Sequence, residues 1–232
     1  LRKYFYKKTD LNIKIIWVSI RKKIINGLSY IENSLFDNYF SFSTINIKKN
    51  LFLEHSHNKL NFLMSYAALK CLTLDNKKIL NSLLKFKGIP HRMEHVGMFD
   101  NIYFYNDSKA TNVAATCSAL ESFNKVILIA GGSQKGESFK PLLKFSNKVY
   151  EAYLIGETAK DIKKVLEKNC KSFICQSLEE AVLLSYKKNT SLRKKYPILL
   201  SPACASFDKY KNFESRGKDF RRIFNQISNG KL

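Results

Sequence analysis

The chain has 232 residues, of which 45% are hydrophobic and 25% are charged. This balance excludes a disordered tail, a collagen-like repeat and a small disulfide-stapled domain, and it suffices for one or two globular domains. Lysine and arginine number 40 against 19 aspartate and glutamate, which gives a net charge of +21. Such a charge first suggests nucleic acid or an anionic membrane as a partner.

The cations are spread along the chain and are mostly lysine, 33 against 7 arginines. Proteins that read nucleic acids rely on arginine, whose planar fork fits phosphates and guanine edges. A solvated lysine-rich surface is therefore the favoured interpretation, and a basic nucleic-acid-binding module stays open as an alternative.

The first part of the chain carries weak structural signals. Short apolar stretches at residues 13–20 and 40–47 suggest short strands among Lys and Asn. Apolar residues at helical spacing predict helices over residues 57–71 and 76–86. Gly88, Ile89 and Pro90 then break the pattern, which predicts a domain boundary between residues 89 and 90.

From residue 91 onward, strands and helices alternate. Strands are predicted over residues 102–105, 126–130, 152–155, 172–175 and 198–200, and helices over residues 113–123, 158–168, 178–186 and 212–227. Regular alternation with apolar strands indicates an α/β fold whose parallel sheet is covered on both faces.

Three polar segments follow these strands, at residues 106–112, 131–138 and 201–213. Ligands of such sheets bind beyond the carboxyl ends of the strands. The first segment combines Asp107 and Lys109 with hydroxyls before a helix N-terminus, which favours an anionic ligand, although helix capping alone is the competing explanation. In the second, glycines allow close backbone approach and Lys135 supplies a charge, but the segment is not a P-loop.

Cysteine and histidine spacing predicts no metal or disulfide framework. The five cysteines include no C-x-x-C pair, so reduced thiols are expected. Cys204 is predicted to pack in the core, because no histidine follows it that could activate a nucleophile. No segment approaches the ~18 apolar residues of a membrane span. The sequence therefore predicts a cytoplasmic protein without a membrane partner.

Four strings occur in an order that resembles the Mur ligases, in particular the members that add D-glutamate. They are PHRMEHVG (90–97), YNDSKATN (105–112), IAGGSQKG (129–136) and LLSPACASFDKYKNFESRG (199–217). HNKLN (57–61) also resembles the H-N-x-x-N segment that closes the family's ATP domain. The resemblance covers residues 57–227.

The resemblance implies a fold and an activity. It implies a C-terminal Rossmann-like domain with a mostly parallel sheet at residues 90–232, preceded by the tail end of a mixed α/β ATPase domain at residues 1–89. The family forms an amide in peptidoglycan precursor synthesis: ATP converts the carboxylate of UDP-N-acetylmuramoyl-L-alanine to an acyl phosphate, which the amine of D-glutamate attacks. Mg²⁺ takes part, with ligands expected upstream of residue 1.

Matching positions imply the site residues. Those expected to bind D-glutamate are Thr111, Lys135, Ser206, Phe207 and, through its backbone, Phe213. Those expected to meet ATP are Asn58, Asn61, Arg92, Asp107 and Lys109. Lys109 would support catalysis, Arg216 would be a further functional cation, and no residue is expected to act as a lone nucleophile or metal ligand.

The resemblance also implies that part of the family's machinery is missing from this sequence. The phosphate-binding loop and the UDP-sugar domain have no counterpart here, so the chain alone is expected to be an inactive monomer. A truncated record, a degraded gene and one half of a split enzyme remain open explanations, as does a non-functional remnant.

Overall fold

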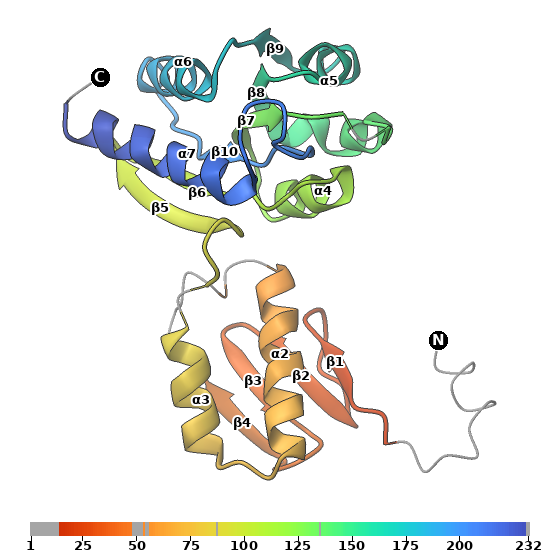
Figure 1. The fold of residues 1–232 in the computed structure, drawn as a ribbon. Helices are drawn as coiled ribbons and strands as arrows, with labels where there is room; N and C mark the ends of the chain where they lie inside the picture. Colours follow the sequence, from red (N-terminus) through yellow and green to blue (C-terminus); the bar gives the residue numbers. More distant parts are fainter. Residues whose placement is uncertain (1–13, 48–52, 54–55, 87, 135, 231–232) are drawn as a thin grey trace. The chain divides into compact units, whose positions relative to one another are not determined.

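The computed structural model describes residues 14–47, 53, 56–86, 88–134 and 136–230. The chain divides into two compact units, Leu1–Lys87 and Gly88–Leu232 (Figure 1). The division lies two residues before the predicted boundary, at the start of the same Gly88-Ile89-Pro90 sequence.

The first unit contains a four-stranded sheet and two helices. Its elements are β1 (Trp17–Ser19), β2 (Gly27–Ile31), β3 (Ser34–Asp37), β4 (Ser43–Asn46), α2 (Ser56–Cys71) and α3 (Asn76–Lys85). The strands lie in chain order, with β1 parallel to β2 and the other pairs antiparallel. Strands β2 and β3 were not predicted, because their turn uses Glu32 and Asn33 at positive φ and carries no glycine signal.

One apolar cluster holds the first unit together. Leu28 and Leu35 from the sheet pack with Leu63 and Tyr66 of α2 and with Ile79 of α3, all of them buried. The helix α3 begins where Asp75 accepts a hydrogen bond from the backbone N–H of Lys78 (3.0 Å). The two helices predicted here are confirmed to within a residue at each end.

The second unit is built on a six-stranded sheet in the order β5-β6-β10-β7-β8-β9. Its strands are β5 (Glu94–Phe99), β6 (Ile102–Asn106), β7 (Val126–Gly131), β8 (Val149–Ile155), β9 (Lys171–Ile174) and β10 (Ile198–Leu200). Every pairing is parallel except that of β5 with β6. The predicted α/β fold with a mostly parallel sheet is confirmed.

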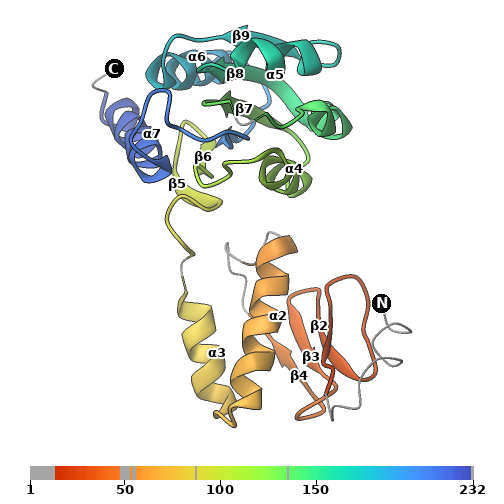
Figure 2. The same ribbon diagram turned by 45° about the vertical axis from the view of Figure 1, so that its right-hand side comes forward.

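Helices cover both faces of this sheet (Figure 2). They are α4 (Val113–Glu121), the 3₁₀-helix η2 (Lys140–Lys148), α5 (Ala159–Leu166), α6 (Leu178–Thr190) and α7 (Phe213–Ser228). One apolar cluster joins the sheet to α4, η2 and α5, and a second joins it to α6 and α7. The buried strands β7 and β10 contribute to both clusters, which explains their continuous apolar sequences.

Two elements of this unit escaped prediction. The strand β5 turns into β6 through Asp100 and Asn101, both at positive φ, and glycine, the usual signal for such a turn, is absent there. The helix η2 is a run of 3₁₀ turns whose spacing differs from the α-helical period. Among the residues that the structure describes, no helix is long and apolar enough to cross a membrane.

Candidate functional site

The three polar segments meet at one edge of the six-stranded sheet. They meet because β10 lies between β6 and β7, with Leu200 in register with Asn106 on one side and with Ile129 on the other. Backbone bonds continue the pairing past the strand ends: the N–H of Asp107 donates to Leu200 O (2.8 Å) and that of Gly131 donates to Pro202 O (2.8 Å). The segments that follow β6, β7 and β10 therefore start side by side.

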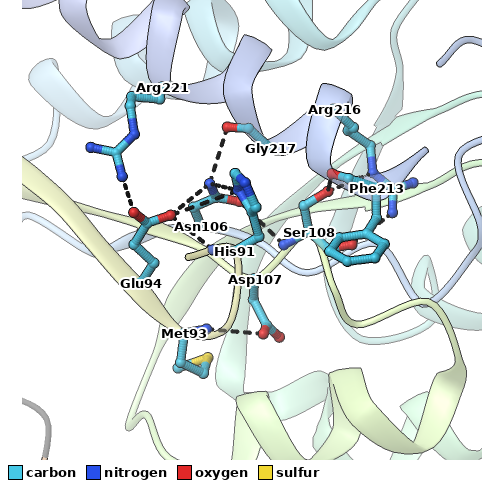
Figure 3. A network of polar contacts seen from close by, with 10 residues as sticks. All are labelled: His91, Met93, Glu94, Asn106, Asp107, Ser108, Phe213, Arg216, Gly217 and Arg221. Atoms are coloured by element: carbon cyan, nitrogen blue, oxygen red, sulfur yellow. Dashed lines mark hydrogen bonds and ion pairs between the residues drawn. The ribbon is translucent and has the colours of Figure 1, made fainter. Parts of the chain in front are cut away.

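Arg216 joins two of these segments from the inside. Its side chain is 1% exposed, and its guanidinium donates to the carbonyl of Ser108 (2.9 Å; Figure 3). It also donates to the carbonyls of Cys204 (3.1 Å) and Ala205 (3.1 Å). Burial lowers the pKa of Arg216 to about 10, against the opposing effects of Cys204, Asp208 and Tyr210. The expectation that Arg216 faces a small anionic ligand is not met, because backbone carbonyls occupy its donors.

Ser108 extends this network to the start of α7. Its hydroxyl accepts from Arg216 Nε (3.0 Å) and donates to the carbonyl of Phe213 (2.8 Å). Phe213 follows Asn212, which caps the helix by accepting from the backbone N–H of Ser215 (2.8 Å). The ammonium of Lys109 lies 5.4 Å from the centre of the Phe213 ring. The loop and the first turn of the helix around Phe213 are thus fixed from three directions.

Asp107 points into the protein. It is 5% exposed, and its carboxyl accepts from the backbone N–H of Met93 (3.1 Å; Figure 3). The carboxyl also accepts from the hydroxyl of Ser201 (2.8 Å). Burial raises the pKa of Asp107 to about 7, although the bonds from Ser201 and Met93 and the charge of Arg92 act in the opposite direction. Both carboxyl oxygens have internal partners, and the expected contact with ATP stays a prediction.

A second network lies beside Asp107 and ties residues 91–94 to α7. The side-chain amide of Asn106 lies within 3.0 Å of His91 Nδ1, 3.1 Å of Glu94 Oε2 and 3.0 Å of the Gly217 carbonyl, and Glu94 pairs with Arg221 (Figure 3). Burial and the charge of Arg221 lower the pKa of His91, which suits a ring nitrogen that accepts from Asn106. A Cβ at Gly217 would collide with His91 Nδ1, so only glycine leaves room for this ring.

These contacts hold the backbone beneath two predicted ATP-facing cations. The carbonyl of His91 accepts from the backbone N–H of Lys109 (2.9 Å), and the N–H of Arg92 donates to Ile89 O (3.2 Å). The side chain of Arg92 is exposed and that of Lys109 is half-buried. His91, Glu94 and Asn106 received no role from the sequence, although all three stand in the strings that carried the resemblance.

The residues expected at the D-glutamate site have different surroundings. Ser206 is 2% exposed and its hydroxyl has no hydrogen-bond partner among the described residues. The neighbouring Phe207 is 72% exposed, and Thr111 is half-buried, with its N–H bonded to Lys109 O (2.8 Å). Lys135 lies outside the described residues.

Three residues singled out from the sequence remain, Asn58, Asn61 and Cys204. Asn58 and Asn61 belong to α2 of the first unit, where Asn58 is buried and Asn61 exposed. Cys204 packs in the core of the second unit as predicted, and burial raises the pKa of its thiol. Within the described parts of the chain, no three His, Cys, Asp or Glu side chains come together as a metal-binding group.

Comparison with curated proteins finds similar sequences in bacteria. A UDP-N-acetylmuramoylalanine–D-glutamate ligase of Rickettsia bellii is 35% identical over 219 residues, which are 94% of this chain and 48% of that protein. The ligase of the same name from Clostridioides difficile is 39% identical over 227 residues, which are 93% of this chain and 48% of that protein. The chain thus spans about half the length of the curated relatives it matches.

Comparison with solved structures finds the same fold. UDP-N-acetylmuramate-alanine ligase of Thermotoga maritima has a TM-score of 0.61 at 17% identity, covering 90% of this chain and 48% of that one. The folylpolyglutamate synthase/dihydrofolate synthase of Yersinia pestis has a TM-score of 0.59 at 13% identity, over 85% of this chain and 45% of that one. Residues 91–204 match the family model described as Mur ligase, glutamate ligase domain. With these matches and the ordered strings at the carboxyl edge of its sheet, the chain belongs to the Mur ligase family.

Proposed function

We propose that the chain is the C-terminal portion of an ATP-dependent amide ligase that adds D-glutamate to UDP-N-acetylmuramoyl-L-alanine in peptidoglycan precursor synthesis. One observation carries the proposal. Residues 91–204, which match the glutamate ligase domain, contain the six-stranded sheet and, at the carboxyl ends of its strands, two of the three polar segments and the start of the third. Residues 1–89 would be the end of the central ATP-binding domain of such an enzyme. Residues 90–232 would be its D-glutamate-binding domain.

The chemistry of D-glutamate fits the residues at this edge. Its two carboxylates need a cation and hydroxyl or amide donors. Lys135 would supply the cation, Thr111 and Ser206 the hydroxyls, and Phe213 its backbone, with Phe207 beside them. The buried hydroxyl of Ser206 supports this role, because a buried polar group without a protein partner is costly unless a ligand or water completes its bonds.

The nucleotide would approach from the other side of the same edge. Arg92 and Lys109 would stabilise the charge that develops as a phosphoryl group passes to the alanyl carboxylate. Asn58, Asn61 and Asp107 would complete the ATP contacts. The described residues supply no ligand cluster for Mg²⁺, so no step is assigned to the metal in this part of the enzyme. Orientation of the two substrates would be the main catalytic contribution.

Titration of the chain with D-glutamate, followed by NMR, tests the proposal. We expect weak, saturable binding that is stronger for D-glutamate than for L-glutamate, together with no ATP hydrolysis by the chain alone. Lys135→Ala and Ser206→Ala should each weaken binding about tenfold or more, since each removes a bond to a carboxylate. Lys164→Ala is the matched control, because Lys164 is exposed on α5 with its ammonium 3.7 Å from Asp161.

Two results would count against the proposal. One is the absence of saturable D-glutamate binding, and the other is equal affinity for both enantiomers. Steeply salt-dependent binding of DNA or RNA at the same protein concentration would instead favour the nucleic-acid alternative that the charge of +21 suggests.

A further inference from the structure

Asp208 lies between the loops that follow three different strands. It belongs to the loop after β10, two residues beyond Ser206. Its Oδ1 accepts from the hydroxyl of Ser133 (3.3 Å), and its own backbone N–H donates to that hydroxyl oxygen (2.8 Å). Its Oδ2 accepts from the backbone N–H of Glu157 (3.4 Å). One side chain therefore joins the loops after β7, β8 and β10.

Glycines make room for this contact. A Cβ at Gly156 would collide with Asp208 Oδ2 and would lie 2.9 Å from Gly132 Cα, and Gly156 has φ of 73°. A Cβ at Gly132 would collide with the carbonyl of Ala205. The sequence suggested that Gly132 brings the backbone close to a ligand. In the structure, Gly132 brings the loop after β7 close to the loop after β10.

Further bonds hold the same loop immediately before Lys135. The N–H of Ser133 donates to Ala205 O (3.0 Å), a carbonyl that also accepts from Arg216. The N–H of Gln134 donates to Glu157 Oε2 (3.2 Å). Desolvation lowers the pKa of the buried Arg216, and the charge of Asp208 acts in the opposite direction, together with Cys204 and Tyr210.

We propose that Asp208 is a positioning residue that locks the loop after β7 against the loop carrying Ser206 and Phe207, and so sets where the hydroxyl of Ser206 meets a carboxylate of D-glutamate. This inference rests on the proposed function for its ligand. The backbone N–H groups of Ser133 and Gln134 in the loop after β7, and that of Asp208 in the loop after β10, are already bonded to neighbouring loops. A loop that is ordered before the ligand arrives loses less conformational entropy on binding.

The experiment measures the D-glutamate dissociation constant of the chain and of two variants by NMR titration. Asp208→Ala removes both carboxyl contacts, so the binding step must then supply the cost of ordering the loops, and we expect binding to weaken about tenfold. Asp208→Asn keeps an acceptor for Ser133 and places an amide where the N–H of Glu157 needs an acceptor, so a smaller loss of about threefold is expected.

Glu151→Gln is the matched control. Glu151 is also a buried carboxylate with two partners, the hydroxyl of Tyr153 (3.0 Å) and the ammonium of Lys188 (3.9 Å). It stands near the start of β8, at the end of the sheet opposite the site. This variant should lower the thermal midpoint and leave the dissociation constant unchanged. Equal affinity in Asp208→Ala and the unaltered chain would overturn the inference.

Amide hydrogen exchange separates this inference from the proposed function. Asp208→Ala should speed exchange at the N–H groups of Ser133 and Gln134 and leave the strand β7 protected. If the unaltered chain shows no saturable D-glutamate binding, the proposed function and the ligand named here fail. The locking of the loop is then tested by hydrogen exchange alone, and unchanged exchange at the amides of Ser133 and Gln134 in Asp208→Ala would refute it. Should Asp208→Ala fail to fold, Ser133→Ala removes the contact between Ser133 and Asp208 from the other side. It should likewise weaken D-glutamate binding and speed exchange at the amide of Gln134, and no change in either would refute the inference.

Discussion

The two units bury their polar groups for different purposes. In the first unit, Asp37 collects four hydrogen bonds: from the N–H groups of Tyr39 (3.1 Å) and Phe40 (2.8 Å) and from the hydroxyls of Ser41 (2.7 Å) and Tyr66 (3.0 Å). These bonds close one turn onto one helix. In the second unit, the buried polar residues at the carboxyl edge join segments far apart in the sequence, as Arg216 does with Ser108.

The difference shows how a fold prepares a site. Three of the four donors to Asp37 lie within four residues of it in the sequence, and only Tyr66 comes from another element. At the carboxyl edge, each loop depends on bonds from a neighbouring loop or from α7, so the loops gain their positions together. Changes in the second unit should therefore spread further than changes of the same size in the first.

Arg216→Met should have the largest effect on this comparison. It leaves the buried carbonyls of Ser108 and Cys204 without a donor among the described residues, whereas that of Ala205 keeps its bond from Ser133. We expect this to lower the free energy of unfolding of the second unit by about 4 kcal/mol. The first unit should be unaffected. Trp17, the single tryptophan of the chain, lies in β1 and reports unfolding of the first unit by fluorescence. Hydrogen exchange in β7 reports the second unit.

Arg221→Met is the control for this prediction. Arg221 lies on the same helix and pairs with Glu94, but its side chain is 46% exposed. Exposed ion pairs contribute about 1 kcal/mol or less. If both variants lost equal stability, the buried hydrogen bonds of Arg216 would contribute no more to stability than the exposed ion pair of Arg221, which would contradict this prediction.

The contributions of Asp107 in the second unit and Asp37 in the first to the pH dependence of stability should have opposite signs. Burial raises the pKa of Asp107 from the usual 3.8 of an aspartate to about 7 in the folded chain. Between these values the unfolded chain has lost the proton and the folded chain keeps it, so rising pH costs stability. Asn carries no such proton. Asp107→Asn should therefore gain stability relative to the unaltered chain as pH rises from about 4 to about 7, by on the order of 2 kcal/mol.

Asp37 provides the opposite case. Burial alone would raise its pKa, but the bonds from Ser41, Phe40, Tyr39 and Tyr66 outweigh burial and the pKa lies below its usual value of 3.8. Its contribution is fully present above that usual value and is lost as pH falls through the folded pKa. Trp17 fluorescence during urea unfolding at a series of pH values would show this loss. Unfolding curves of both units that shift together with pH would contradict the comparison.

Tyr66→Phe should have the smallest effect. It removes one of four donors to Asp37 and leaves the apolar packing of the ring in place, so a loss of about 1 kcal/mol is expected, confined to the first unit. Tyr30→Phe is the control, because Tyr30 is also buried and its hydroxyl has no hydrogen-bond partner in the part of the chain that the structure describes. A larger loss in Tyr30→Phe than in Tyr66→Phe would contradict this account.

The sequence predicted those elements whose signal is local. The apolar runs of β7 and β10 and the apolar spacing of α2 and α3 were each visible within a few residues. The turns at Glu32 and Asp100 use residues other than glycine at positive φ, so their hairpins left no local sign. The inward direction of Arg216 depends on carbonyls of Ser108 and Cys204, which only the folded sheet brings near it. Predicted ligand contacts came from the family resemblance and await binding measurements.

The position of β10 has a consequence for how the chain is made. This strand lies in the middle of the sheet, between β6 and β7, although it is the last strand in the sequence. Until residue 200 has left the ribosome, β6 and β7 have no common neighbour, and the unpaired edges of both strands stay open to other chains. The second unit can therefore complete its sheet only after β10 has been made, and a chain released before residue 198 would lack the strand that joins its two halves.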